Sequence, residues 1–405
     1  MEQVTIREHV APGRAPAVTR ERAAVALLFL MNGYILGGWT PKIPEFAARL
    51  GLDSAGMGLM ILVFGLGSLT LMPVAGALSA RYGSGAVARG FGLGVVPALL
   101  AIAFVPGVVA AAIVMFCFGG AIAAMDVAMN ANAVAVEKSM RRAIMSSCHA
   151  FWSLGGLIGA ATGGFLIAHF GAAVQALVAT VTAAVLLAAA WPSVLPDRNH
   201  IAARPADGSR RKFAPKFNLP KSPLPWLVGL MALFSMIPEG AILDWGAYHM
   251  KQDLGASVML AGFGFAAFSC AMATMRFAGD LVRDRFGAVR TLRGCTLIAI
   301  AGMLVVGLAR DPYTAIAGFA LCGIGISNMV PIAFSIAGNM PGVSPGVGLS
   351  IATMLGYSGM LVAPSLIGFV ARHSGFGIIF VSLPVLLLVV LACSGLARHA
   401  DHSAQ

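Results

Sequence analysis

An acid and an amide lie one helical turn apart inside an apolar stretch of the chain. Residues 121–142 read AIAAMDVAMNANAVAVEKSMRR, and a helix there would place Asp126, Asn130 and Glu137 on one face. A carboxylate at the centre of a bilayer costs at least about 2.5 kcal/mol, and such residues mark solute and proton paths. Asp126 is therefore a candidate for either role, with a buried structural carboxylate as the alternative. We expect Glu137, beside Lys138, to belong to an ion-pair cluster at the membrane surface.

A second acid directly follows a proline in another apolar stretch. Residues 235–250 read SMIPEGAILDWGAYHM, and Pro238 removes a backbone donor next to Glu239. We expect a broken helix here, with Glu239 as a reversible proton carrier because desolvation favours the neutral form of a carboxyl group. In that case we assign Asp126 to orienting the solute. The alternative is a kinked gate at which Glu239 is simply solvated. Asp244 lies toward the end of the stretch, as a site residue or as a solvated acid beside an interfacial tryptophan.

The remaining candidates are aromatic and polar side chains within apolar stretches. Aromatic rings stack on solutes, but they also concentrate at membrane interfaces. His149 lies close to a loop, so a solvated histidine is as compatible with its position as a binding residue. The candidates of this kind are Tyr34, His149, Trp152, Asn328 and Tyr357.

Composition indicates which elements hold these residues. The chain is 59% hydrophobic and 11% charged, with a mean hydropathy of +0.87, whereas soluble proteins carry about 25% charged residues. Such a chain is a polytopic membrane protein, and lipid requires its spans to be helical. Each of about twelve apolar stretches is long enough to cross the bilayer. They lie near residues 23–46, 55–79, 86–105, 108–136, 144–169, 172–193, 223–249, 257–282, 288–309, 312–338, 346–371 and 375–397.

Lysine and arginine set the expected orientation. With the N-terminus inside, 21 of them fall in inner segments and five in outer loops, while Arg276 lies within a span. This bias places both termini in the cytoplasm, and we expect no signal peptide before the first span. The basic residues lie in short loops, so we expect no nucleic-acid partner. Six unpaired cysteines and the lack of nucleotide, nucleophile or metal motifs indicate neither enzyme nor cofactor nor metal site.

The two halves of the sequence resemble each other at a spacing of 204 residues. GALSARYGSGAVARG at 76–90 aligns with DLVRDRFGAVRTLRG at 280–294. One shift over the whole length indicates two parallel six-helix repeats, an architecture in which the solute site lies between the halves. The expected parts are an N-terminal segment 1–22, a first half 23–193, a linker 194–222, a second half 223–397 and a tail 398–405.

These repeated loops resemble the motif G-x-L-x-D-R-x-G-R of the major facilitator superfamily. The resemblance covers about residues 23–397 and implies the fold of that family, twelve helices in two parallel halves. It also implies that the loops close the cytoplasmic side through charge contacts. The first copy has Ala80 in place of the acid, so half of that closure is in doubt. The second copy has Asp280 in place of the first glycine. The residues at the motif positions are Gly76, Arg81, Gly83, Asp280, Asp284, Arg285 and Gly287.

Several segments, among them MDVAMNANAVAVE and PEGAILDWGAY, resemble the YbjJ-type and rhizopine-transport-like subgroup of bacterial inner-membrane proteins. The resemblance implies a secondary transporter, and the acids of the fourth and seventh spans favour one that moves a small polar solute such as a sugar or polyol. We expect this transporter to be a monomer. It would reside in the bacterial inner membrane and use protons and alternating access. An exporter of drugs or amphipathic metabolites and a non-transporting sensor are the alternatives.

One motif points to export but has a simpler interpretation. GGLIGAATGG at 155–164 matches an antiporter signature except that Ala160 replaces its proline, and the second half keeps the proline as Pro364. Because the pattern is divided between the halves, we interpret it as close helix packing through small residues.

Overall fold

The computed structural model describes residues 18–197, 220 and 222–401. Most of the expected N-terminal segment, most of the linker and the last residues of the tail lie outside them. The described residues contain twelve helical stretches that are long and apolar enough to cross a membrane, as the sequence predicted.

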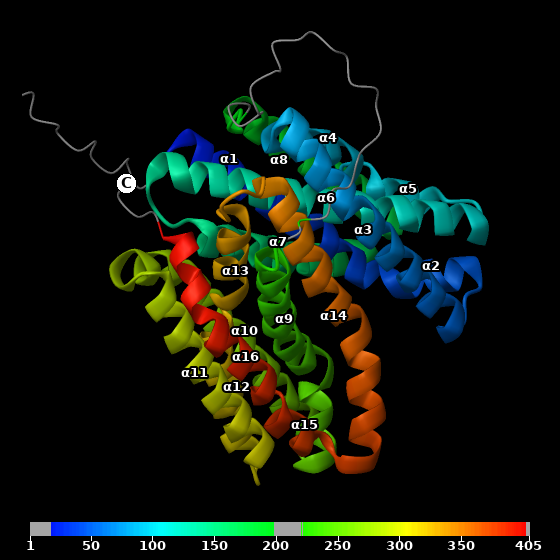
Figure 1. The fold of residues 1–405 in the computed structure, drawn as a ribbon. Helices are drawn as coiled ribbons and strands as arrows, with labels where there is room; N and C mark the ends of the chain where they lie inside the picture. The colour runs from blue at the N-terminus through cyan, green and yellow to red at the C-terminus, as the bar shows by residue number, and fades with distance from the viewer. Residues whose placement is uncertain (1–17, 198–219, 221, 402–405) are drawn as a thin grey trace, which may run out of the picture.

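Six of these stretches make up the first half (Figure 1). The second, fourth and fifth are single helices, whereas Pro97 interrupts the third. The elements are α1 (Arg20–Trp39), η1 (Thr40–Lys42), α2 (Ile43–Leu50), α3 (Ser54–Tyr82), α4 (Ser84–Val95), α5 (Ala98–Phe104), α6 (Val108–Met140), α7 (Met145–Phe170), α8 (Ala172–Ala190) and η2 (Trp191–Ser193).

The second half repeats this arrangement. The tenth span of the chain is divided there into two helices, α12 and α13. The elements are α9 (Leu224–Tyr248), the π-helical turn η4 (His249–Asp253), α10 (Val258–Phe286), α11 (Ala288–Leu308), α12 (Pro312–Ile326), α13 (Met329–Gly338), α14 (Pro345–Ser374), α15 (Phe376–Ser382), α16 (Pro384–Cys393) and η5 (Ser394–Ala400).

The structure repeats at the same 204-residue spacing as the sequence. Gly83 and Gly287 both end a helix with positive φ, at 87° and 80°, where a glycine avoids the strain that a Cβ would cause. The carboxylate of Asp197 accepts hydrogen bonds from the N-terminal amides of α4, and Asp401 does the same for α11. The two aspartates are also 204 residues apart, a match that sequence comparison alone did not identify.

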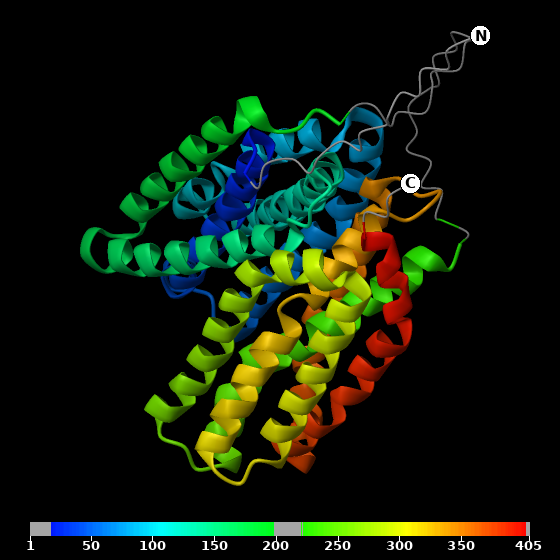
Figure 2. The same ribbon diagram turned by 90° about the vertical axis from the view of Figure 1, so that its left-hand side faces the viewer.

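The halves meet at one end only. Figures 1 and 2 show the two groups of helices touching near the start of α14 and the end of α10, while α2 and α15 at their other ends diverge. We call the end where they meet the basic face, because it carries the arginines around positions 81, 141 and 283. Near this face a Cβ on Gly76 of α3 would lie 2.7 Å from the carbonyl oxygen of Gly346 in α14. The structure is therefore closed at the basic face.

Glycines let α1 and α7 approach each other at backbone distance. A Cβ on Gly155 would lie 2.1 Å from the Leu30 carbonyl oxygen, and one on Gly159 would lie 2.1 Å from the Tyr34 carbonyl oxygen. The antiporter-like glycines at these two positions thus pack helices together, as small residues do in membranes.

This contact predicts that alanine substitutions at two glycines of α7 differ strongly in their effect on stability. Gly155→Ala should destabilise the protein by about 1–3 kcal/mol, because its Cβ must displace backbone. Gly164→Ala is the matched control, since its Cβ would have nothing nearer than Pro41 at 3.9 Å. Thermal unfolding in detergent measures both, and equal midpoints for the two variants would contradict the packing interpretation.

Candidate functional site

Asp126 is the centre of a hydrogen-bonded chain that joins the two halves. The side-chain amide of Asn130, one turn along α6, donates to its Oδ1 at 3.2 Å. From the other half, the hydroxyl of Tyr357 in α14 lies 3.5 Å from its Oδ2. Asp126 is only 4% exposed. The two groups that approach this buried carboxylate are therefore both neutral.

His149 extends the chain into α7. Its Nε2 lies 3.2 Å from Oδ1 of Asn130, so it donates to that oxygen. The imidazole lies between the rings of Phe29 and Phe334, with centroids 5.3 and 5.7 Å away. The histidine is thus half-buried among aromatic rings.

A second polar group surrounds Arg276, a residue that we had not selected. Its Nη2 lies 3.2 Å from Oε1 of Glu239, and its Nη1 donates to Oγ of Ser153 across the halves at 2.8 Å. Its Nε donates to the carbonyl oxygen of Ser327 at 3.3 Å. Arg276 is 5% exposed. A cation inside a span was the available signal, because such residues pair with an acid or with carbonyl groups.

The helix around Glu239 differs from our expectation. α9 runs unbroken from Leu224 to Tyr248 with Pro238 inside it. The preceding turns and the neighbouring helices keep it helical, and the acid is held by Arg276 rather than by exposed backbone. The break lies instead in the tenth span, between Ile326 and Met329.

The other candidates divide between this region and the periphery. The indole N–H of Trp152 donates to Oδ1 of Asn32 at 3.0 Å. Asn328 is fully buried at the break, with its Nδ2 3.1 Å from Oγ of Ser327. Tyr34 is buried where α1 meets α7, and Asp244 is exposed toward the far end of α9. The hydrogen bonds of the described residues connect neither Tyr34 nor Asp244 to Asp126.

At the basic face, three carboxylates surround the N-terminus of α7. Five consecutive backbone amides, those of residues 143–147, donate to Asp284, Glu137 and Asp280, an arrangement that we call the α7 cap. A helix N-terminus favours negative charge, since its first amides lack helical partners. Asp280 and Asp284 belong to α10, so the cap joins the halves. The bonds are Ala143 to Asp284 at 3.1 Å, Ile144 and Met145 to Glu137 at 3.0 and 3.2 Å, and Ser146 and Ser147 to Asp280 at 2.9 and 3.0 Å.

Glu137 is not part of a surface cluster, so that expectation was wrong. The side chain is fully buried, and its Oε1 lies 2.8 Å from Nη1 of Arg283 in the other half. Its Oε2 accepts from the hydroxyl of Ser335 at 2.8 Å, and Arg283 also donates to the carbonyl of Ala400. Burial is tolerable because the charge is paired and each oxygen is hydrogen-bonded.

The two copies of the loop motif make different contacts. In the second copy Asp280 and Asp284 form the α7 cap, and the guanidinium of Arg285 lies 5.7 Å from the ring of Phe286. In the first copy the guanidinium of Arg81 lies 5.0 Å from the ring of Tyr82. Gly76 of the first copy approaches the backbone of α14 across the halves. The second copy thus contributes two carboxylates to the contact between the halves, and the first contributes a close approach of backbone.

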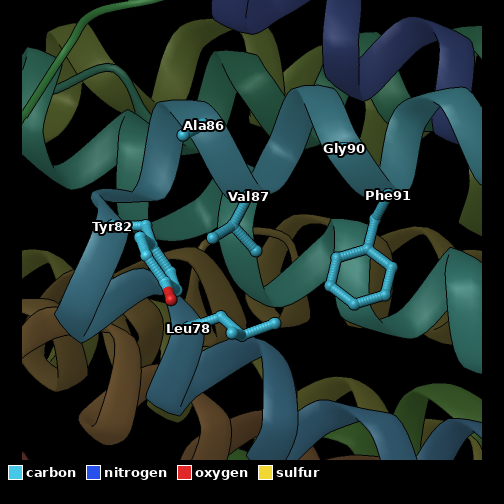
Figure 3. Close-up of a pocket in the computed structure, with 6 residues that line it drawn as sticks. All are labelled: Leu78, Tyr82, Ala86, Val87, Gly90 and Phe91. Carbon is cyan, nitrogen blue, oxygen red and sulfur yellow. The ribbon is translucent and has the colours of Figure 1, made fainter.

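An apolar hollow of about 410 Å³ lies apart from these groups, between α3 and α4. Figure 3 shows the rings of Tyr82 and Phe91 on either side of it, with Leu78 and Val87 between them. Its lining includes no acid or base apart from the tyrosine. The buried acidic and basic side chains described above therefore lie between the halves and not in this hollow.

Similarity to known proteins extends over nearly the whole chain. The profile of the Major Facilitator Superfamily matches residues 24–246 and 233–405. An uncharacterised MFS-type transporter of Yersinia pestis is 34% identical over 375 residues, which are 92% of this chain and 94% of that protein. Membrane protein MosC of Rhizobium meliloti is 30% identical over 402 residues, or 98% of this chain and 94% of MosC.

Solved structures share the fold at low identity. FucP in its outward conformation aligns with a TM-score of 0.75 at 16% identity, over 95% of this chain and 98% of FucP. The proton:xylose symporter XylE aligns with a TM-score of 0.67 at 12% identity, over 94% of each chain. The chain is thus a multi-pass membrane protein and not an enzyme, and it belongs to the major facilitator superfamily of transporters.

Proposed function

We propose that this protein moves a small polar solute, such as a sugar or polyol, across the bacterial inner membrane by proton-driven alternating access. The observation that carries the proposal is the buried polar chain from Tyr357 through Asp126 and Asn130 to His149, which spans both halves. Hydroxyl and amide groups of this kind exchange hydrogen bonds with a polar solute. Sites in this architecture lie between the repeats.

Two acids are candidates for the proton carrier. From the sequence we assigned the proton to Glu239 and the orientation of the solute to Asp126. The geometry supports the reverse, because Glu239 faces the guanidinium of Arg276 whereas Asp126 faces only neutral donors. A buried carboxylate without a counter-ion is costly unless it takes up a proton or another cation. In this proposal Asp126 binds the proton, and the Glu239–Arg276 pair contacts the solute.

The α7 cap serves as the cytoplasmic gate in this proposal. It holds α10 against the start of α7 through the carboxylates of Asp280 and Asp284. Arg283 and Glu137 add a second cross-half pair behind it. With the basic face on the cytoplasmic side, the described arrangement is closed to the cytoplasm.

Purified protein in proteoliposomes tests the assignment of the proton. A thermal-shift panel of sugars and polyols, beginning with fucose and xylose because FucP and XylE carry those names, selects the solute. Asp126→Asn should then abolish accumulation driven by an imposed pH gradient, yet preserve exchange of labelled for unlabelled solute. Glu239→Gln should instead raise the solute concentration needed for half-maximal exchange by about tenfold or more, because it removes a charge-assisted contact.

Two results would contradict this assignment. If Asp126→Asn still accumulates solute against its gradient, Asp126 is not the carrier. If Glu239→Gln loses accumulation but retains normal exchange, Glu239 carries the proton, as the sequence first suggested. If amphipathic drugs bind in the thermal-shift measurement and no sugar or polyol does, the result favours the alternative function, export.

The gate predicts a difference between the two copies of the loop motif. Asp284→Asn should increase the rate at which N-ethylmaleimide labels Cys148 by about tenfold, because a charged hydrogen bond contributes about 1.5–3 kcal/mol. Cys148 is buried beside the charges of Asp280, Glu137 and Arg22, so its labelling reports opening of the basic face. Ser79→Ala is the control, because it removes only a hydroxyl where α3 packs against Gly346 of α14, and it should change the rate little. Equal rates for the two variants would contradict a gate that depends more on the second copy of the loop motif than on the first.

A further inference from the structure

The break in the tenth span leaves one backbone carbonyl without its helical partner. In a continuous helix the oxygen of Ser327 would accept from the amide four residues later, which belongs to Pro331. Proline has no N–H, so this bond cannot form. The next carbonyl is normal, since Asn328 accepts from the amide of Ile332 at 3.0 Å. A buried carbonyl that finds no donor is costly, and the donor that reaches Ser327 is Nε of Arg276, at 3.3 Å.

This bond fixes the orientation of the guanidinium. The group is planar, and its N–H donors point in fixed directions. Once Nε is held by Ser327, Nη1 is directed to Ser153 in the other half and Nη2 to Glu239. The carbonyl freed by Pro331 therefore determines how Arg276 bridges α7, α9 and α10.

A close approach of α10 makes the bond possible. Oδ1 of Asn328 lies where a Cβ of residue 279 would be, only 1.8 Å from that ideal position, so only glycine fits there. This oxygen has no hydrogen-bond partner within the described part of the chain. Gly279 is three residues after Arg276, on the same side of α10. The break and the arginine are thus held at one point of contact.

We propose that Pro331 is a positioning residue that orients Arg276 and thereby sets how firmly the two halves are held together. The inference rests on the proposed role of the Glu239–Arg276 pair in alternating access. Restoring an N–H at position 331 would let the carbonyl of Ser327 close the helix and release Nε of Arg276. The Arg276–Ser153 bond across the halves would then weaken, and the basic face would open more often.

Labelling of Cys148 by N-ethylmaleimide tests this without any solute, so its outcome is independent of the transport assignment. Pro331→Ala should raise the labelling rate about threefold to tenfold, in the range of a lost charge-assisted hydrogen bond. Arg276→Lys, which keeps the charge but lacks the planar fork, should raise it similarly. The double variant should be labelled no faster than the faster single variant, because both changes remove one interaction.

Pro73→Ala is the control, since Pro73 also lies inside a span, in α3, but outside this contact. It should leave the rate near that of the natural protein. The proposal is overturned if Pro331→Ala matches the natural protein or Pro73→Ala, or if the effects of Pro331→Ala and Arg276→Lys multiply.

Hydrogen exchange gives a second measurement. The backbone amide that Pro331→Ala introduces should exchange slowly if the Ser327 carbonyl accepts from it, and fast exchange with unchanged labelling would also overturn the proposal. If Pro331→Ala does not fold, Pro331→Val restores the same N–H while keeping more of the ring's volume, and the same comparisons apply.

Discussion

The arrangement of the two halves depends on the unpaired amides at the start of α7. Every helix N-terminus needs acceptors, and here the acceptors come from both halves: Glu137 from α6, and Asp280 and Asp284 from α10. Because the carboxylates of α10 satisfy three of these amides, the halves cannot separate at this end without exposing three donors and two acids. The opposite ends diverge, as Figure 1 shows. The α7 cap thus accounts for which end of the protein is closed.

The polar site between the halves uses a different principle. Asp126 is buried and Glu239 is partly buried, but only Glu239 has a counter-ion. A paired charge can remain in place through a cycle, whereas an unpaired one must exchange a proton or bind a cation as its surroundings become dry. The cap and the site are coupled through α7, since His149 and Ser153 follow the capped amides by about one and two turns. A movement of α7 away from α10 would therefore disturb both.

The sequence predicted the spans and the repeat, because these follow from hydropathy and spacing, and it also selected Asp126, Asp280 and Asp284 as candidates. Periodicity assigns a residue to a helix face but not to a partner on a distant helix. Glu137 therefore looked like a surface acid, and its pairing with Arg283, 146 residues away, was missed. Arg276 could have been selected from the sequence. The residue 204 positions earlier is Met72, so Arg276, like Asp126, has no counterpart in the other half.

Distances between the halves at the face opposite the cap test the account most directly. Spin labels at Leu59→Cys in α3 and Phe369→Cys in α14, both exposed positions near that face, report the separation once the native cysteines are replaced. The natural α7 cap should give a long distance, and Asp280→Asn, which weakens the cap, should shift the population toward shorter distances. A distribution that Asp280→Asn leaves unchanged would contradict the claim that the cap holds the basic face closed.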